Sequence, residues 1–174
     1  MNLYLYSSQD PINNFDLLGL LVQIHSRSVI GTKGAGAHTY ITITDSGGNT
    51  STYGSYQNKY DLNEVRKNDP TDHGHKRLPV TSSIDISPPE GMAPDEWDEA
   101  VISAAENRRF TQIQLYKIFG GDGGDLSGNC HTTTRGIIRD AGGFIPPDFD
   151  PPGLNPGLYP NRRSFLDKGP LDYW

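Results

Sequence analysis

The stretch GNCHTTTRGII, residues 128–138, predicts a helix that begins at the single cysteine of the chain. Asn129 is a good N-cap, and a Gly-Gly pair ends the helix about ten residues later. Cys130 then lies in the first turn, where the helix dipole and unpaired N–H groups stabilise a thiolate. Such a cysteine can act as a nucleophile, with its own backbone N–H and that of His131 facing a developing oxyanion. The alternative is a buried cysteine that packs as a small apolar side chain.

Upstream, the stretch AHTYITIT, residues 37–44, alternates β-branched and aromatic residues and places His38 at the entrance of a strand. The turn residues DSGGN follow, and residues 50–54 resume the strand pattern, which predicts a β-hairpin. A neutral imidazole can take the proton of a thiol and later return it to a leaving amine. His38 is therefore the candidate base for Cys130. The alternative is an exposed loop histidine with no partner.

The rest of the chain predicts an α+β fold. Residues 94–109 have proline and acidic residues at the start, a buried stripe at helical spacing and two arginines at the end. Further strands are expected at residues 80–86 and 113–119, whereas residues 57–78 read as polar and irregular. We expect a short antiparallel sheet, beginning with the His38 hairpin, packed on the helices of 94–109 and 130–141.

Composition narrows the classes of function. The chain has 174 residues, enough for one domain with a core, and a formal net charge of -6 without any basic stripe. One cysteine excludes an internal disulfide and any zinc site with two thiolates. No apolar stretch approaches the ~18 residues that cross a bilayer, and the first residues do not resemble a signal peptide. We expect no cofactor, no bound metal and no nucleic-acid or membrane partner.

The first 20 residues carry a specific motif. They read N-L-Y-L-Y, then a turn at Asp10, then D-L-L-G-L. This string resembles the last segment of the Rhs repeat-associated core, with matches at Asn2, Leu3, Tyr4, Tyr6, Pro11, Asp16, Gly19 and Leu20. Two positions depart from the family pattern, because Asp10 stands in place of asparagine and Leu17 in place of proline. In the family, the Rhs shell is cut just after the Gly-Leu pair, which frees a variable toxin.

The Rhs resemblance implies a domain organisation and a destination. Residues 1–20 would be the end of the Rhs core motif, residues 21–37 a flexible linker and residues 38–174 the toxin domain, with autocleavage after Leu20. The toxin would be secreted and delivered into the periplasm or cytoplasm of a target cell. Its expected partners are the Rhs shell, the secretion apparatus and a cognate immunity protein that covers its cleft.

The order of the two chemical motifs carries a second resemblance. A histidine hairpin followed by a helix and then by Asn-Cys at a helix start is similar to permuted papain-like proteins, among them NlpC-type peptidases and lecithin–retinol acyltransferase-like enzymes. The resemblance implies a permuted papain-like fold in which Cys130 and His38 hydrolyse a peptide or peptidoglycan-peptide amide. It also implies a polar orienting residue on the strand after the histidine strand. Thr52 or Thr50 is the candidate there, with a backbone carbonyl as the alternative.

Other residues leave other functions open. Asp72, His73 and His75 form a D-H-G-H stretch, and H-x-H on a strand points both rings to one side, as in half of a zinc or manganese site. With Asp69 or His25 as a further ligand, this stretch would suit a metal-dependent nuclease. The Cys–His pair would also suit acyl transfer or lipid hydrolysis. A binding module without catalysis is the remaining alternative.

Overall fold

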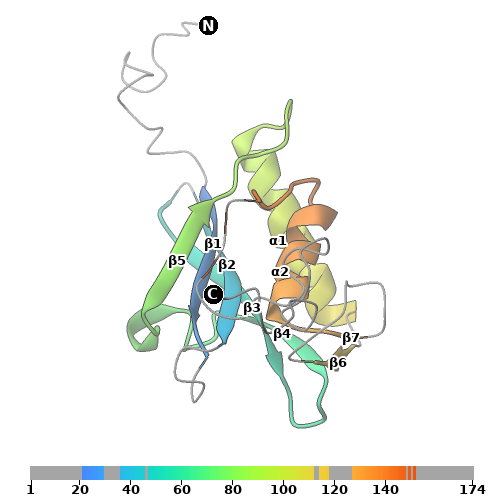
Figure 1. The fold of residues 1–174 in the computed structure, drawn as a ribbon. Coiled ribbons are helices and arrows are strands. Elements are labelled where there is room, and N and C mark those ends of the chain that lie inside the picture. The colour runs from blue at the N-terminus through green and yellow to red at the C-terminus, as the bar shows by residue number, and fades with distance from the viewer. Residues whose placement is uncertain are drawn as a thin grey trace, which may run out of the picture.

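The computed structural model describes residues 21–29, 36–45, 47–111, 114–117, 127–147, 149 and 151. They form an α+β fold in which two helices pack against a five-stranded antiparallel sheet (Figure 1). The sheet strands are β1 (Leu21–Ser28), β2 (Ala37–Thr44), β3 (Thr50–Gln57), β4 (Asn63–Lys67) and β5 (Val80–Asp85). The remaining elements are a 3-10 turn η2 (Gly74–Lys76), α1 (Pro94–Thr111), β6 (Leu115–Tyr116), β7 (Ser127–Gly128) and α2 (Cys130–Asp140).

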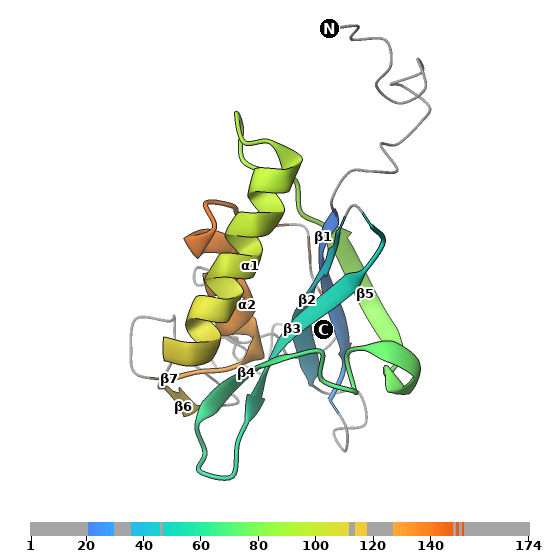
Figure 2. The same ribbon diagram turned by 180° about the vertical axis from the view of Figure 1, so that it is seen from behind.

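The sheet has the strand order β4-β3-β2-β1-β5, so the histidine strand β2 lies at its centre. The predicted hairpin is confirmed, since β2 pairs antiparallel with β3 across a turn in which Asp45 accepts hydrogen bonds from Gly47 and Asn49. Figure 2 shows the chain leaving β4 and crossing to the other end of the sheet, where it enters β5. That crossing segment, residues 68–79, brings Asp72 to the sheet.

Two expectations about the sheet are wrong. Residues 21–28 are not a linker, because they form β1 and pair with β2 on one side and β5 on the other. Residues 57–78 are not irregular throughout, because 63–67 form the edge strand β4. The predicted strand near residue 115 is the short β6, which pairs parallel with β7 just before α2.

The core lies between the sheet and the helices. Alternate residues of the central strands, such as Ile24 and Ile41, face the helices and contact the predicted stripe of α1. The apolar residues of this cluster are Val22, Ile24, Ile41, Ile43, Tyr53, Ile86, Trp97, Val101, Ala105, Ile137, Ile138, Ala141 and Phe149. Burial of such side chains contributes about 25 cal/mol per Å² of apolar surface. The core therefore holds α2 in place against β2.

Both helices begin close to where the sequence places them and end within two residues of the expected positions. Within the described ranges, no helix combines the length and the apolar character that a membrane crossing requires. The Rhs-like motif of residues 1–20 and the expected cut after Leu20 lie outside the described residues.

Candidate active site

Cys130 is the first residue of α2, as the sequence predicts. Asn129 caps this helix: its side chain accepts a hydrogen bond from the backbone N–H of Thr132 at 3.0 Å. In return, the Thr132 hydroxyl accepts from the Asn129 N–H at 2.7 Å, which completes a capping box. These two reciprocal hydrogen bonds fix the geometry of the first turn. The Cys130 sulfur therefore has a defined position at the positive end of the helix dipole.

The start of α2 lies against the start of β2, and this contact brings Cys130 to His38. The Cys130 sulfur is 4.0 Å from the Ala37 carbonyl oxygen and accepts a hydrogen bond from the Thr39 backbone N–H. These two residues flank His38, whose imidazole lies near enough to the sulfur for each group to shift the pKa of the other. Cys130 and His38 are 4% and 5% exposed. The predicted pair therefore meets in a largely water-excluded place.

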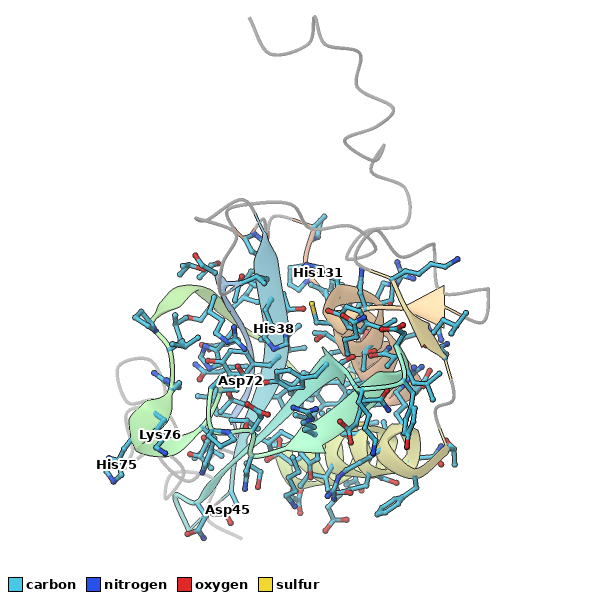
Figure 3. All side chains as sticks on the ribbon, turned by 90° about the horizontal axis from the view of Figure 1, so that it is seen from below. His38, Asp45, Asp72, His75, Lys76 and His131 are labelled. Atoms are coloured by element: carbon cyan, nitrogen blue, oxygen red, sulfur yellow. The ribbon has the colours of Figure 1, made fainter. Side chains whose placement is uncertain are left out.

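Asp72 is the third member of the group. Its Oδ2 lies 3.0 Å from Nε2 of His38, which leaves Nδ1 as the ring nitrogen for the sulfur. Tyr56 donates its hydroxyl to the same Oδ2, and Arg27 donates Nε–H to Oδ1 at 2.7 Å. Figure 3 shows His38 and Asp72 side by side in the interior of the molecule. A carboxylate in this position holds the imidazole in one orientation and stabilises its charged form.

Gly54 of β3 makes room for the Asp72 carboxylate. A Cβ at residue 54 would lie 2.6 Å from Asp72 Oδ2 and 3.2 Å from the Tyr56 hydroxyl oxygen. Glycine inside a strand commonly marks such a close approach. The sheet is therefore shaped, at one position of β3, to admit the carboxylate of the crossing segment.

The electrostatics favour a thiolate–imidazolium pair. Burial alone would lower the pKa of His38, but the charge of Cys130 and the hydrogen bond and charge of Asp72 raise it to about 9. Burial alone would raise the pKa of Cys130, but the charge and hydrogen bond of His38, with hydrogen bonds from Thr39 and Tyr116, lower it. Each residue stabilises the charged form of the other. Such a pair can supply a nucleophile and a proton donor.

Asp72 itself stays ionised. Burial would raise the pKa of its carboxyl group, but the hydrogen bond and charge of His38 and the hydrogen bonds of Tyr56 and Arg27 lower it. Burial and the neighbouring Asp72 raise the pKa of Tyr56, which therefore keeps its proton and remains a donor. The carboxylate thus carries a full negative charge beside His38.

Tyr116 of β6 is a further neighbour of the sulfur. Its hydroxyl hydrogen-bonds with the Cys130 sulfur and with the Cys130 backbone N–H. Burial and the Cys130 charge raise the pKa of Tyr116, so its proton stays in place. The Tyr116 hydroxyl and the Cys130 N–H are therefore neighbours of the sulfur and of each other. His131, the other predicted backbone donor, is buried, and its Nδ1 lies 3.2 Å from Thr39 Oγ1.

The predicted orienting threonines lie elsewhere. Thr52 pairs with Thr42, four positions along β2 from His38, which corresponds to about 13 Å at the usual rise of a strand. Thr50 pairs with Thr44, two residues farther along. The structure therefore does not bring either threonine to the imidazole. Asp72 occupies that place instead, and it comes from the crossing segment and not from the strand after the histidine strand.

The residues of the alternative metal site do not come together among the described residues. His73 is the residue just before the 3-10 turn η2, and His75 lies within that turn, so neither is on a strand. Figure 3 shows His75 at the periphery of the molecule. Asp69 binds Thr71 within its own turn, and His25 is buried on β1 against Tyr40. In the part of the chain that the structure describes, no three His, Cys, Asp or Glu side chains are arranged to hold a metal ion.

Comparisons of the chain with protein-family models, with curated proteins and with solved structures found no match.

Proposed function

We propose that the chain is a cysteine hydrolase that cleaves amide bonds, with Cys130 as nucleophile, His38 as proton carrier and Asp72 as the residue that orients His38. One observation carries the proposal: the buried contact between the Cys130 sulfur and the His38 imidazole, with the Asp72 carboxylate on the opposite ring nitrogen. A nucleophile, a base and a group that orients the base are the arrangement that acyl transfer requires.

In the first half of the reaction, the Cys130 thiolate attacks the carbonyl carbon of the amide and forms a C–S bond. The carbonyl oxygen becomes an oxyanion, and we assign the Cys130 N–H and the Tyr116 hydroxyl, which lie beside the sulfur, as its donors. The His38 imidazolium then gives its proton to the amide nitrogen. The C–N bond breaks, the amine leaves, and a thioester remains on Cys130.

In the second half, neutral His38 takes a proton from a water molecule. The resulting hydroxide attacks the thioester carbonyl, the C–S bond breaks, and the acid product leaves. The thiolate and the imidazolium are thereby restored. Asp72 keeps its charge throughout and stabilises His38 whenever the ring is protonated. No metal and no redox step enters this cycle.

The chain order supports a permuted papain-like architecture for this enzyme, because the histidine hairpin precedes the cysteine helix. The resemblance of residues 1–20 to an Rhs core supports a role as a delivered toxin domain. In that role the substrate would be a peptide or peptidoglycan-peptide bond of the target cell. A cognate immunity protein would protect the producing cell, and the Rhs shell with its secretion apparatus would deliver the domain into the periplasm or cytoplasm.

The test is to express the full chain in bacteria, with and without an export signal, as wild type and as Cys130→Ser, His38→Ala and His75→Ala. The His75 variant is the matched control, because this exposed histidine lies on η2 away from the pair. We expect growth inhibition by the wild type and His75→Ala only. Purified Cys130→Ser should lose at least ~10⁴-fold in hydrolysis.

The compartment in which the wild type acts identifies the target. Toxicity only after export indicates peptidoglycan peptides, and toxicity without export indicates a cytosolic protein. Full toxicity of Cys130→Ser would overturn the proposal. Loss of toxicity in His75→Ala with a fully toxic Cys130→Ser would instead favour the metal-dependent nuclease.

A further inference from the structure

We propose that Arg27 is a positioning residue, which fixes the Asp72 carboxylate so that one oxygen always faces His38. This inference rests on the proposed function, because it concerns the same site. The hydrogen bonds of Arg27 go to Asp72, Thr71 and the Ser28 carbonyl, and none of them goes to the Cys130 sulfur. The effect of Arg27 is transmitted through Asp72.

The geometry divides the two carboxylate oxygens between different partners. Arg27 Nε binds Oδ1 at 2.7 Å, whereas His38 Nε2 and the Tyr56 hydroxyl bind Oδ2. Arg27 Nη2 also donates to the hydroxyl of Thr71, the residue before Asp72, at 3.0 Å. The guanidinium therefore holds both the side chain and the preceding turn of the crossing segment. Rotation of the carboxylate away from His38 would break the bond to Arg27.

The charges in this part of the molecule alternate. Arg27 and His38 are direct cross-strand partners in β1 and β2, so their side chains lie on the same face of the sheet. Two neighbouring cations would repel and lower the pKa of the imidazole. Asp72 lies between them and binds both. Arg27, Asp72, His38 and Cys130 thus form a buried row of charges in which every neighbour has the opposite sign.

The sheet is irregular where Arg27 lies. Ser26 pairs with Ser82 of β5, but Arg27 pairs with Val80, so Thr81 is an extra residue in β5. The Thr81 hydroxyl donates to the Ser26 carbonyl oxygen at 3.1 Å. Such bulges re-aim side chains and are frequent beside active sites. This bulge lies at the first residues of β5, where the crossing segment with Asp72 joins the sheet.

Lysine at residue 27 would not reproduce the hydrogen bonds that Arg27 makes. The two donors that Arg27 uses toward Asp72 and Thr71 belong to one planar group with fixed directions. A lysine ammonium carries the same charge as a point on a flexible stem. Lysine at residue 27 therefore separates the effect of charge from the effect of geometry.

The test uses the full chain with Arg27→Met and Arg27→Lys. The readout is the pH dependence of Cys130 alkylation by iodoacetamide, together with the ultraviolet absorbance of its thiolate, so no substrate is needed. Without Arg27, the Asp72 carboxylate is no longer held with Oδ2 toward His38, so its support of the His38 imidazolium weakens. The midpoint of thiolate formation should rise by about one pH unit in Arg27→Met. Arg27→Lys should restore part of the shift.

The matched control is Arg139→Met, since this arginine lies near the far end of α2 with a side chain 65% exposed. Its midpoint should equal that of the wild type. The decisive variant is Arg27→Met combined with Asp72→Asn, which removes both buried charges together. If Arg27 acts through Asp72, this double variant has a midpoint no higher than that of Asp72→Asn alone, because without the carboxylate the remaining effect of Arg27 on His38 is repulsion. The double variant also decides the question if Arg27→Met alone does not fold.

Two results would overturn the inference. One is an unchanged midpoint in folded Arg27→Met, and the other is a further rise of the midpoint when Arg27→Met is added to Asp72→Asn. A different result would overturn the proposed function itself: a wild-type Cys130 that is alkylated only at the ordinary thiol midpoint of about 8.5. The wild-type curve therefore separates the two failures.

Discussion

Asp72 and Asp98 are both buried carboxylates, and they differ in their surroundings. Asp72 is 0% exposed and Asp98 is 3% exposed. Asp72 has a partner on each oxygen: Arg27 on Oδ1, and His38 and Tyr56 on Oδ2. Asp98, in α1, has no hydrogen-bond partner on either oxygen within the described part of the chain.

The pKa values of the two groups move in opposite directions. Burial would raise the pKa of both, but hydrogen bonds and the charge of His38 lower the pKa of Asp72. Nothing offsets burial at Asp98, and the nearby charges of Asp45 and Asp95 add to it, so its pKa rises to about 6. The comparison teaches that partners, and not burial, decide whether a carboxylate is ready for chemistry. Of these two carboxylates, Asp72 has such partners and Asp98 has none among the described residues.

The largest expected effect comes from removing the charge of Asp72. Asp72→Asn should lower kcat/KM by ~10²–10⁴-fold, because His38 loses its orientation and the support for its charged form. The carboxylate raises the pKa of His38, so its loss lowers that pKa from about 9. Activity requires the imidazolium, and the alkaline limb of the pH profile should therefore move to lower pH. The measurement is the pH dependence of kcat/KM.

The same variant should also be less stable. Arg27 would remain buried without its carboxylate, and breaking a buried pair in this way costs about 3–5 kcal/mol of the free energy of unfolding. Urea denaturation measures this loss. Asp98→Asn is the matched control, since among the described residues it neutralises a second buried aspartate without touching the site. An Asp72→Asn enzyme with wild-type rate and an unmoved alkaline limb would remove Asp72 from the mechanism.

The second effect is on stability alone. The folded-state pKa of Asp98 lies at about 6, above the ordinary value of 3.8, so the folded chain binds this proton more tightly. The resulting stabilisation is fully present below pH ~4 and is lost as the pH rises through about 6. Asp98→Asn should therefore raise the free energy of unfolding by roughly 2–3 kcal/mol at pH 7 and by almost nothing at pH 4.

Urea denaturation of the wild type and of Asp98→Asn at both pH values measures the difference. Hydrolytic activity should not change, because Asp98 lies in α1, outside the group around Cys130. Equal stability gains at pH 4 and pH 7 would show that packing, and not an unpaired charge, explains the result.

Local signals made half of the site predictable. Asn129 and Cys130 follow a capping pattern, and His38 opens a strand with clear alternation, so each could be assigned from a few neighbouring residues. Asp72 has no such signal, because it lies in an irregular segment and its partners Arg27 and His38 are far away along the chain. Only the fold brings these residues together. A cross-strand arginine beside the candidate histidine is the one hint, and it requires the register of β1 to be known.

β1 could not be predicted from the sequence, because residues of the site interrupt its strand pattern. Its core-facing residues Val22 and Ile24 alternate as expected, but the residues on the opposite face include His25 and Arg27, which are buried as well. A strand buried on both faces with polar residues on one of them reads as a polar connector. The polar residues of the site therefore break the alternation of apolar and polar residues by which a strand is recognised in a sequence.

The smallest expected effect concerns Thr52, the threonine that the papain-like resemblance selected as orienting residue. Its hydroxyl oxygen is buried and has no hydrogen-bond partner among the described residues, so it resembles Asp98 and not Asp72. Thr52→Val keeps the shape and removes the hydroxyl. Stability should stay the same or rise by about 1 kcal/mol, because a buried unpaired polar group is lost.

The rate should match the wild type within about twofold, and both limbs of the pH profile should stay in place, since Thr52 lies about 13 Å of strand away from His38. A large loss of kcat, with the alkaline limb of the pH profile moved to lower pH, would instead show that Thr52 helps Asp72 to orient His38.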